Sequence, residues 1–258
     1  AERVEVEGDR RFTFHLRPGH RWSDGEPFTT EDFRYTWEDV FGNARLRPSG
    51  VPIEMLVHGE RPLFEILSPT VVRYTWSHPN PTFLASLAGP RPLEIFAPAH
   101  YLKQFHEKYA KPEELEKKVR DERVRNWAVL HNRRDNQYRL DNPDMPTLQP
   151  WMLTTAPPAE RFVFKRNPYY HRVDSEGRQL PYLDEVVMSV ADGKIVPLKT
   201  GAGEADLQAR YIRFDNYTFL KEAEQRSGFK VRLWRTVRGA DQALVPNLNV
   251  NEIGRAHV

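Results

Sequence analysis

Short stretches of alternating apolar and polar residues, separated by turns, recur along this chain and constrain its fold more than any other feature. Val4 and Val6 alternate before a Gly-Asp turn, and Phe12, Phe14 and Leu16 alternate after it, which predicts a two-stranded hairpin. The same pattern predicts further strands at residues 72–76, 162–165, 185–190, 207–214 and 229–235.

Helical patterns stand between these strands, so we expect an α/β organisation. Apolar residues at helical spacing predict helices at residues 80–87, 98–109, 113–130, 194–200 and 217–226. Residues 43–70 contain Pro and Gly with weak periodicity, and we expect them to be irregular. Residues 132–150 are polar and contain proline, which predicts a long loop that is functional or lies between domains.

Residues 21–41 read RWSDGEPFTTEDFRYTWEDVF and combine six carboxylates with aromatic residues. Thr29 stands three residues before Asp32, the spacing of a capping box, in which the two side chains satisfy helix N-terminal N–H groups. Apolar residues then follow at i, i+4 and i+8. We predict that Thr29 caps a helix that runs to about Phe41, with Phe33 and Trp37 buried.

The carboxylates of this segment could form a catalytic pair, a cation site or part of the scaffold. They are Asp24, Glu26, Glu31, Asp32, Glu38 and Asp39. The sequence Ser-Asp-Gly around Asp24 is typical of a turn, and carboxylates in the first turn of a helix are stabilised by the helix dipole. An EF-hand is excluded because its spacing of ligands is absent. We interpret these residues as scaffold.

Composition limits the class of protein. The chain has 258 residues, 39% of them hydrophobic and 12% aromatic, which is enough for one large or two modest folded domains. Lys and Arg number 38 and Asp and Glu 36, and this balance argues against nucleic acid as a partner. Cysteine is absent, so disulfides and thiolate metal sites are excluded, and no apolar run approaches the ~20 residues of a membrane helix.

Enzyme signatures are missing from the sequence. His100 and His106 are six residues apart and so lie on different helix faces, and we expect both at the surface or half-buried. The sequence Gly-Ala-Gly-Glu at residues 201–204 follows a predicted helix and lacks a phosphate-loop pattern, which indicates a helix end and turn. Asp184 and Glu185 are adjacent on a strand and would point to opposite faces. We therefore predict no catalytic residue, metal or cofactor.

Several aromatic side chains admit two interpretations. Trp22, Trp76, Trp151 and the pair Tyr169 and Tyr170 could line a binding cleft, because aromatic residues are common in recognition sites. Individually, each such residue is more often a packing residue of the core.

Five segments together resemble one known family. Residues 15–40, 166–186 and 199–207, reading HLRPGHRWSDGEPFTTEDFRYTWEDV, RNPYYHRVDSEGRQLPYLDEV and KTGAGEADL, resemble hallmark segments of the family 5 extracellular solute-binding proteins. Residues 79–90 and 98–110 resemble the segments between them. The likeness is collinear over nearly all of residues 1–251. It departs from the family at residues 147–151, where TLQPW stands in place of the usual G-T-G-P-Y.

The resemblance implies a two-lobed α/β protein of the periplasmic-binding-protein class with an extra smaller domain, of which only part is present here. By analogy, residues 1–154 form the smaller domain and an edge of the first lobe, and residues 155–251 form an α/β segment of that lobe. Around residues 166–186 we expect a strand, a loop and a strand, with Tyr169 or Tyr170 packed against the main sheet.

The resemblance also implies a function without catalysis. Family members capture peptides or other small solutes by hinge closure and deliver them to ABC permease subunits in the membrane. We expect the ligand to contact Gln149 and Trp151 and the strand formed by Asp241, Gln242, Ala243 and Leu244; packing at a lobe interface is the other interpretation of these residues. The full-length protein is expected to be a monomer, exported by a signal peptide to the periplasm or cell surface. A carbohydrate-active hydrolase with paired carboxylates is the alternative.

The last seven residues, 252–258, read EIGRAHV, which resembles the in-frame translation of a common sequencing adapter. We expect them not to be native; a natural polar tail is the alternative. On the adapter interpretation the opposing lobe is missing, and this chain alone is expected to bind peptides weakly and to expose apolar surface.

Overall fold

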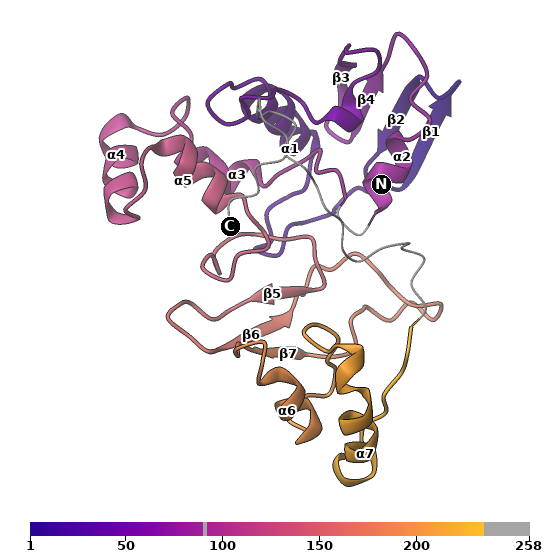
Figure 1. The fold of residues 1–258 in the computed structure, drawn as a ribbon. Coiled ribbons are helices and arrows are strands. Elements are labelled where there is room, and N and C mark those ends of the chain that lie inside the picture. Colours follow the sequence, from indigo (N-terminus) through magenta and orange to yellow (C-terminus); the bar gives the residue numbers. More distant parts are fainter. Residues whose placement is uncertain (90–91, 235–258) are drawn as a thin grey trace, which may run out of the picture. The chain divides into compact units, whose positions relative to one another are not determined.

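The computed structural model describes residues 1–89 and 92–234 (Figure 1). Two compact units are present, Ala1–Val190 and Ala191–Val258. The predicted ligand-facing residues Asp241, Gln242, Ala243 and Leu244 lie outside the described residues, as does the segment 252–258. The domain boundary expected after residue 154 stays a prediction.

A four-stranded antiparallel sheet opens the first unit (Figure 1). Its strands are β1 (Arg3–Glu7), β2 (Arg11–His15), β3 (Leu63–Ser68) and β4 (Val71–Thr75), in the spatial order β1-β2-β4-β3. The predicted hairpin β1–β2 and the strand β4 are confirmed. The prediction that residues 43–70 are irregular is wrong for β3. This edge strand exposes the apolar residues Leu63, Ile66 and Leu67, whereas the polar Glu65 and Ser68 are partly buried, so its sequence lacks the alternation of a half-buried strand.

Aromatic side chains from one face of this sheet form the centre of the core. Phe12 and Trp76 lie against Phe83 of helix α2 (Phe83–Ala88), with ring centroids 5.1 and 4.7 Å from that of Phe83. These rings approach at steep angles, the geometry that aromatic pairs favour. Phe83 is fully buried, so α2 is held against the sheet by this cluster.

Helix α1 (Thr30–Arg34) begins at the predicted cap and continues into a π-helical segment (Tyr35–Phe41). The Thr29 hydroxyl accepts a hydrogen bond from the backbone N–H of Glu31, and Asp32 accepts one from the Thr29 N–H. The predicted cap is confirmed, and Phe33 is buried as expected. Trp37 is only partly buried, less than predicted.

The next helices are shorter than the sequence predicts. The expected helix at residues 98–109 is reduced to α3 (Ala99–Leu102) and a 3₁₀ turn (Lys103–Phe105), because the backbone of His106 adopts an extended conformation that ends the helix. The expected helix at 113–130 is divided into α4 (Pro112–Asp121) and α5 (Trp127–Arg134). Arg123 has a φ of 52° between them, and the Asn126 side chain caps α5 by accepting from the Val129 N–H.

A second antiparallel sheet completes the first unit (Figure 1). It contains β5 (Trp151–Leu153), β6 (Arg161–Arg166) and β7 (Glu185–Ser189), in that order. The predicted strand, loop and strand around residues 166–186 are therefore confirmed. Tyr169, however, lies against the turn at Gly25 instead of the sheet: a Cβ added to Gly25 would be 3.1 Å from the Tyr169 hydroxyl oxygen.

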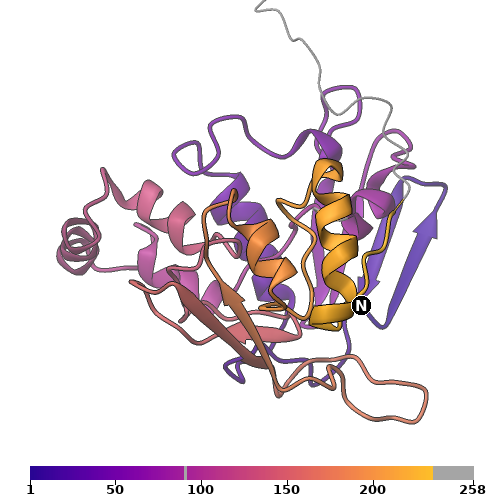
Figure 2. The same ribbon diagram turned by 60° about the horizontal axis from the view of Figure 1, so that its bottom comes forward.

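The second unit contains helices α6 (Val196–Gly201) and α7 (Tyr217–Ser227), which lie side by side in Figures 1 and 2. Phe219 of α7 packs directly on Gly201, where a Cβ would meet its ring at 2.6 Å. Both helices and the turn after α6 were predicted. Two predicted strands are wrong. Residues 207–214 and 229–234 form no strand, and residue 235, the last of the second prediction, lies outside the described residues. Leu207 and Phe214 are 89% and 77% exposed, so no sheet partner covers them within the described chain.

Candidate ligand-binding site

The carboxylates of residues 21–41 act as structural acceptors. Asp32 is buried and accepts from the N–H groups of Thr29 and Ala99 and from the indole N–H of Trp22, at 3.0, 3.1 and 3.2 Å. Burial raises the pKa of Asp32 in spite of these three donors. Asp24 accepts from the Glu26 N–H of its turn and contacts His100 at 2.8 Å. The scaffold interpretation is confirmed for both residues.

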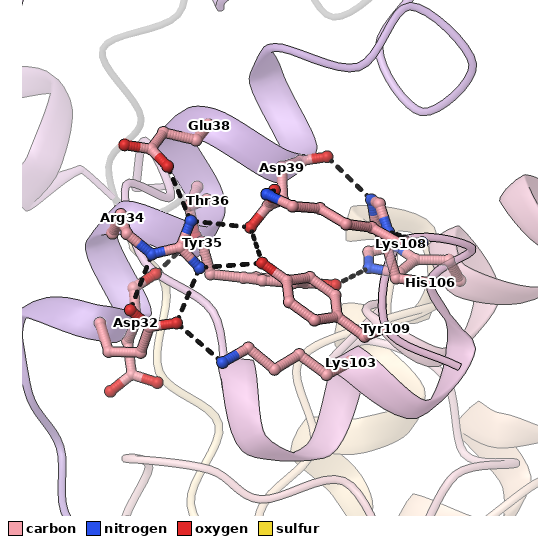
Figure 3. Close-up of polar contacts among 12 residues, drawn as sticks. Asp32, Arg34, Tyr35, Thr36, Glu38, Asp39, Lys103, His106, Lys108 and Tyr109 are labelled. Carbon is pink, nitrogen blue, oxygen red and sulfur yellow. Dashed lines mark hydrogen bonds and ion pairs between the residues drawn. The ribbon is translucent and has the colours of Figure 1, made fainter. Parts of the chain in front are cut away.

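A second cluster surrounds Asp39 (Figure 3). The Arg34 guanidinium reaches Glu31, Glu38 and Asp39, and Asp39 also accepts from Lys108 and from the Tyr109 hydroxyl at 2.6 Å each. Burial alone would raise the pKa of Asp39, but the hydrogen bonds from Lys108 and Tyr109 and the charge of Arg34 outweigh it and lower the pKa. With Glu31 and Glu38 engaged as well, the cluster joins α1 to residues 103–109 and is occupied by its own side chains.

Two histidines complete this buried network. His106 was expected at the surface or half-buried, which is wrong: it is buried and its Nε2 lies 3.1 Å from the Asp39 carbonyl oxygen. His131 is fully buried and its Nε2 lies 2.6 Å from the Tyr35 hydroxyl. Burial, with charge repulsion from His106 and Arg47, lowers the pKa of His131 to about 3, so it is neutral at physiological pH.

The predicted ligand-facing residues Gln149 and Trp151 lie where the 132–150 loop enters β5. Gln149 is exposed, and its N–H donates to the Thr147 hydroxyl at 3.0 Å. Trp151 is partly buried, and its indole N–H donates to the Leu183 carbonyl at 3.1 Å. The Gln149 side chain and part of the Trp151 ring are therefore accessible, and their contact with a ligand stays a prediction.

Asn167 holds this segment in place. Its side chain is fully buried, and its amide nitrogen donates to the Gln149 carbonyl at 3.0 Å. Its backbone N–H donates to the Pro150 carbonyl at 2.9 Å. Sequence patterns assign this side chain no role beyond the Asn-Pro dipeptide. Its position in the RNPYY segment is the one signal that could have identified it.

The other aromatic candidates divide between the two interpretations. Trp22 and Trp76 are 3% and 2% exposed and belong to the core. The Trp76 indole N–H donates to the Met55 carbonyl at 2.8 Å, so it is satisfied internally. Tyr169 is 43% exposed over the Gly25 turn and remains accessible. Of these five candidates, Trp151, Tyr169 and Tyr170 therefore keep surface for recognition.

Asp184 and Glu185 are exposed and lie 3.4 and 3.9 Å from Arg166 and Lys165, as surface ion pairs. Within residues 1–89 and 92–234, no group of three or more His, Asp or Glu side chains is placed to hold a metal ion. Among the described helices, none is long and apolar enough to cross a membrane.

Comparison with known proteins identifies the family. The profile described as "Bacterial extracellular solute-binding proteins, family 5 Middle" matches residues 1–251. This chain therefore belongs to the family 5 extracellular solute-binding proteins, as its hallmark segments predicted.

Relatives by sequence are named as binding proteins. The periplasmic alpha-galactoside-binding protein of Rhizobium meliloti (strain 1021) is 28% identical over 204 residues, which are 78% of this chain and 26% of that protein. The periplasmic oligopeptide-binding protein OppA of Salmonella typhimurium is 26% identical over 182 residues, 66% of this chain and 28% of that protein. These relatives support a binding protein and give no support to the hydrolase alternative.

Solved structures show the same fold. An oligopeptide-binding protein OppA superposes with a TM-score of 0.78 at 38% identity, covering 89% of this chain and 36% of that chain. The binding protein MelB of Agrobacterium fabrum C58, in complex with stachyose, gives 0.67 at 25% identity, covering 86% and 31%. The predicted periplasmic-binding-protein class is confirmed, and this chain spans between 26% and 36% of the length of these four proteins.

Proposed function

We propose that this chain is part of a substrate-binding receptor of an ABC importer, which captures oligopeptides or similar small solutes and delivers them to a membrane permease. The observation that carries the proposal is the 38% identity to an oligopeptide-binding protein, at a TM-score of 0.78 over 89% of this chain. In this proposal the full-length receptor is a monomer in the periplasm or at the cell surface and is exported by a signal peptide. It performs no catalysis.

Recognition of the peptide backbone would give such a receptor broad specificity. An extended peptide offers the same N–H and C=O groups whatever its sequence, so hydrogen bonds to the main chain bind many peptides alike. We assign Gln149 and Trp151 to the wall that meets the ligand, together with the segment from Asp241 to Leu244. The exposed Gln149 amide can both donate to and accept from a peptide group.

Isothermal titration of the full-length protein with a mixed library of short peptides tests the proposal. Saturable binding is expected, and Gln149→Ala and Trp151→Phe should weaken it. Trp151→Phe keeps an aromatic ring in β5, so a loss of affinity would point to the indole and its surroundings. Gln104→Ala, at an exposed position on the 3₁₀ turn after α3, is the matched control. Absence of binding to any peptide would refute a peptide ligand.

An α-galactoside is the second candidate ligand. It is favoured by the relative named for that ligand, which aligns with 78% of this chain, and by the structure of MelB with stachyose. The same titration with stachyose and raffinose separates the two candidates. Binding of these sugars without binding of peptides would assign the receptor to oligosaccharides.

A further inference from the structure

A cavity of about 310 Å³ lies in the first unit beside the C-terminal end of α5. Its volume is at the lower limit of the ~300–1,000 Å³ typical of small-molecule sites. Neither Gln149 nor Trp151 lines it, so it is separate from the segment assigned above. The side chains that matter for its chemistry are Arg47, Glu94, Asn132, Asp135, Gln137 and Tyr138.

Asp135 is the unusual group of this cavity. Its side chain is 13% exposed, and within the described residues no hydrogen bond reaches its carboxylate. Its nearest cation is the Nη2 atom of Arg47 at 3.9 Å, which is beyond hydrogen-bonding distance. Burial raises the pKa of Asp135 to about 7 in spite of the Arg47 charge. The Asp135 carboxylate therefore has no hydrogen-bond donor from the described protein, and a ligand could supply one.

Arg47 is held away from Asp135 by other acceptors. Its Nη1 donates to the Asn132 side-chain oxygen at 2.9 Å and to the Leu46 carbonyl at 3.3 Å. Asn132 in turn donates to the same carbonyl at 3.3 Å. These contacts hold the Arg47 guanidinium at its distance of 3.9 Å from Asp135.

A hydroxyl group beside these two side chains can bridge them. It can donate to the Asp135 carboxylate at about 2.7 Å and accept from the Arg47 guanidinium at about 2.9 Å, since hydroxyls perform both roles. An ammonium group would satisfy Asp135 but be repelled by Arg47. A carboxylate or phosphate would suit Arg47 but be repelled by Glu94, and also by Asp135 where it is ionised, above its pKa of about 7. The mixed charge therefore selects a neutral ligand.

Tyr138 adds an apolar surface beside these polar groups. Its side chain is 70% exposed although it lines the cavity, so its ring is available for stacking. The Gln137 amide donates to the Glu94 carboxylate, and both of these hydrogen-bonding side chains line the same cavity. Apolar ring surface next to groups that bind hydroxyls matches a sugar ring, whose C–H faces are apolar and whose edge carries hydroxyls.

We propose that this cavity is a binding site for a neutral polyhydroxylated ligand of monosaccharide size, with Asp135 and Arg47 sharing a ligand hydroxyl and Tyr138 stacking on the ring. The proposal does not depend on which solute the receptor transports. Asp135, Arg47 and Tyr138 are its three recognition residues.

Amide NMR of the isotopically labelled full-length protein tests this site, because it locates binding to residues 132–138 even when another site takes the same sugar. Methyl α-D-glucopyranoside and methyl α-D-galactopyranoside are the probes, added between about 1 and 100 mM. Propylammonium and propionate are charged probes of smaller size. Saturable shifts at residues 132–138 are expected with at least one glycoside and not with the charged probes.

Variants separate recognition from structure. Asp135→Asn removes the acceptor charge and should weaken local binding roughly tenfold or more, and Tyr138→Ala, at an exposed position that does not hold the fold, should do the same. Tyr182→Ala, also at an exposed tyrosine, is the control and should leave it unchanged. The proposal is overturned if neither glycoside shifts these amides, if a charged probe shifts them equally, or if binding survives both Asp135→Asn and Tyr138→Ala.

Discussion

Replacing Asp135 by Asn is expected to stabilise the protein, and to do so more strongly at high pH than at low pH. The reason is the burial of this carboxyl beside a single cation at 3.9 Å, which raises its pKa from 3.8 to about 7. The folded protein therefore holds a proton on Asp135 between these two pKa values, where the unfolded chain has released it. Stability falls as pH rises across this window, because the unfolded state binds fewer protons.

The magnitude follows from the two pKa values. A difference of about 3 pKa units corresponds to about 4 kcal/mol of destabilisation at pH 8, where Asp135 is ionised in both states. Near pH 5 the folded carboxyl is neutral, and the cost falls to about 2 kcal/mol. Asn has nearly the same shape and no charge, so Asp135→Asn should recover most of this energy, with the gain decreasing by roughly 2–3 kcal/mol from pH 8 to pH 5.

Urea unfolding of this 258-residue chain, followed by tryptophan fluorescence at pH 5 to 8, measures this gain. Five of the six tryptophans lie within residues 1–190, so the signal reports mainly on the unit that contains Asp135. Asp121→Asn, at the exposed last residue of α4, is the matched control for the loss of one carboxylate. A stability difference for Asp135→Asn that is the same at pH 5 and pH 8 would refute the reasoning.

Three other substitutions test the packing and polar contacts of the first unit, each by urea unfolding at pH 7. Thr29→Ala should lower stability by about 1 kcal/mol through loss of the α1 cap, and Thr29→Ser, which keeps the hydroxyl, should restore it. Phe83→Ala should cost about 3–5 kcal/mol because it opens a cavity in the aromatic core; a cost below 1 kcal/mol would contradict that packing. Tyr35→Phe should cost about 1–3 kcal/mol, since it leaves the buried Nε2 of His131 without its 2.6 Å partner. No change on Tyr35→Phe would show that water reaches His131.

The parts of the fold that the sequence predicts are those set by local chemistry. The Thr29 cap depends on atoms three residues apart, and the β1–β2 hairpin on a turn between two alternating segments, so both can be read from short stretches. The break between α4 and α5 could not be predicted by periodicity alone. The charged residues around Arg123 are compatible with a continuous helix. The Asn126 cap ends that continuity by starting α5, and this choice depends on the packing of α5 in the folded chain.

The candidate ligand segment shows the same division. Gln149 and Trp151 were predicted from the five-residue segment TLQPW, where the sequence departs from the family pattern. The contacts of Asn167 to the carbonyls of Gln149 and Pro150 join residues 18 and 17 positions apart and depend on how β5 and β6 pair. Such contacts have no local signature, so this buried amide was assigned no role.

Asp135 was also unassigned, because a lone Asp at a helix end is ordinarily an exposed residue. Its burial arises from Arg47, Glu94 and α5, which meet only in the folded chain. The two expectations for Asp135→Asn, higher stability and weaker binding of a glycoside, can be separated by experiment. A purely structural carboxyl would give the first without the second. A gain in stability together with loss of the local NMR shifts would mean that the Asp135 carboxylate, which destabilises the fold, serves to bind a ligand. Residues at binding sites often reduce stability in this way.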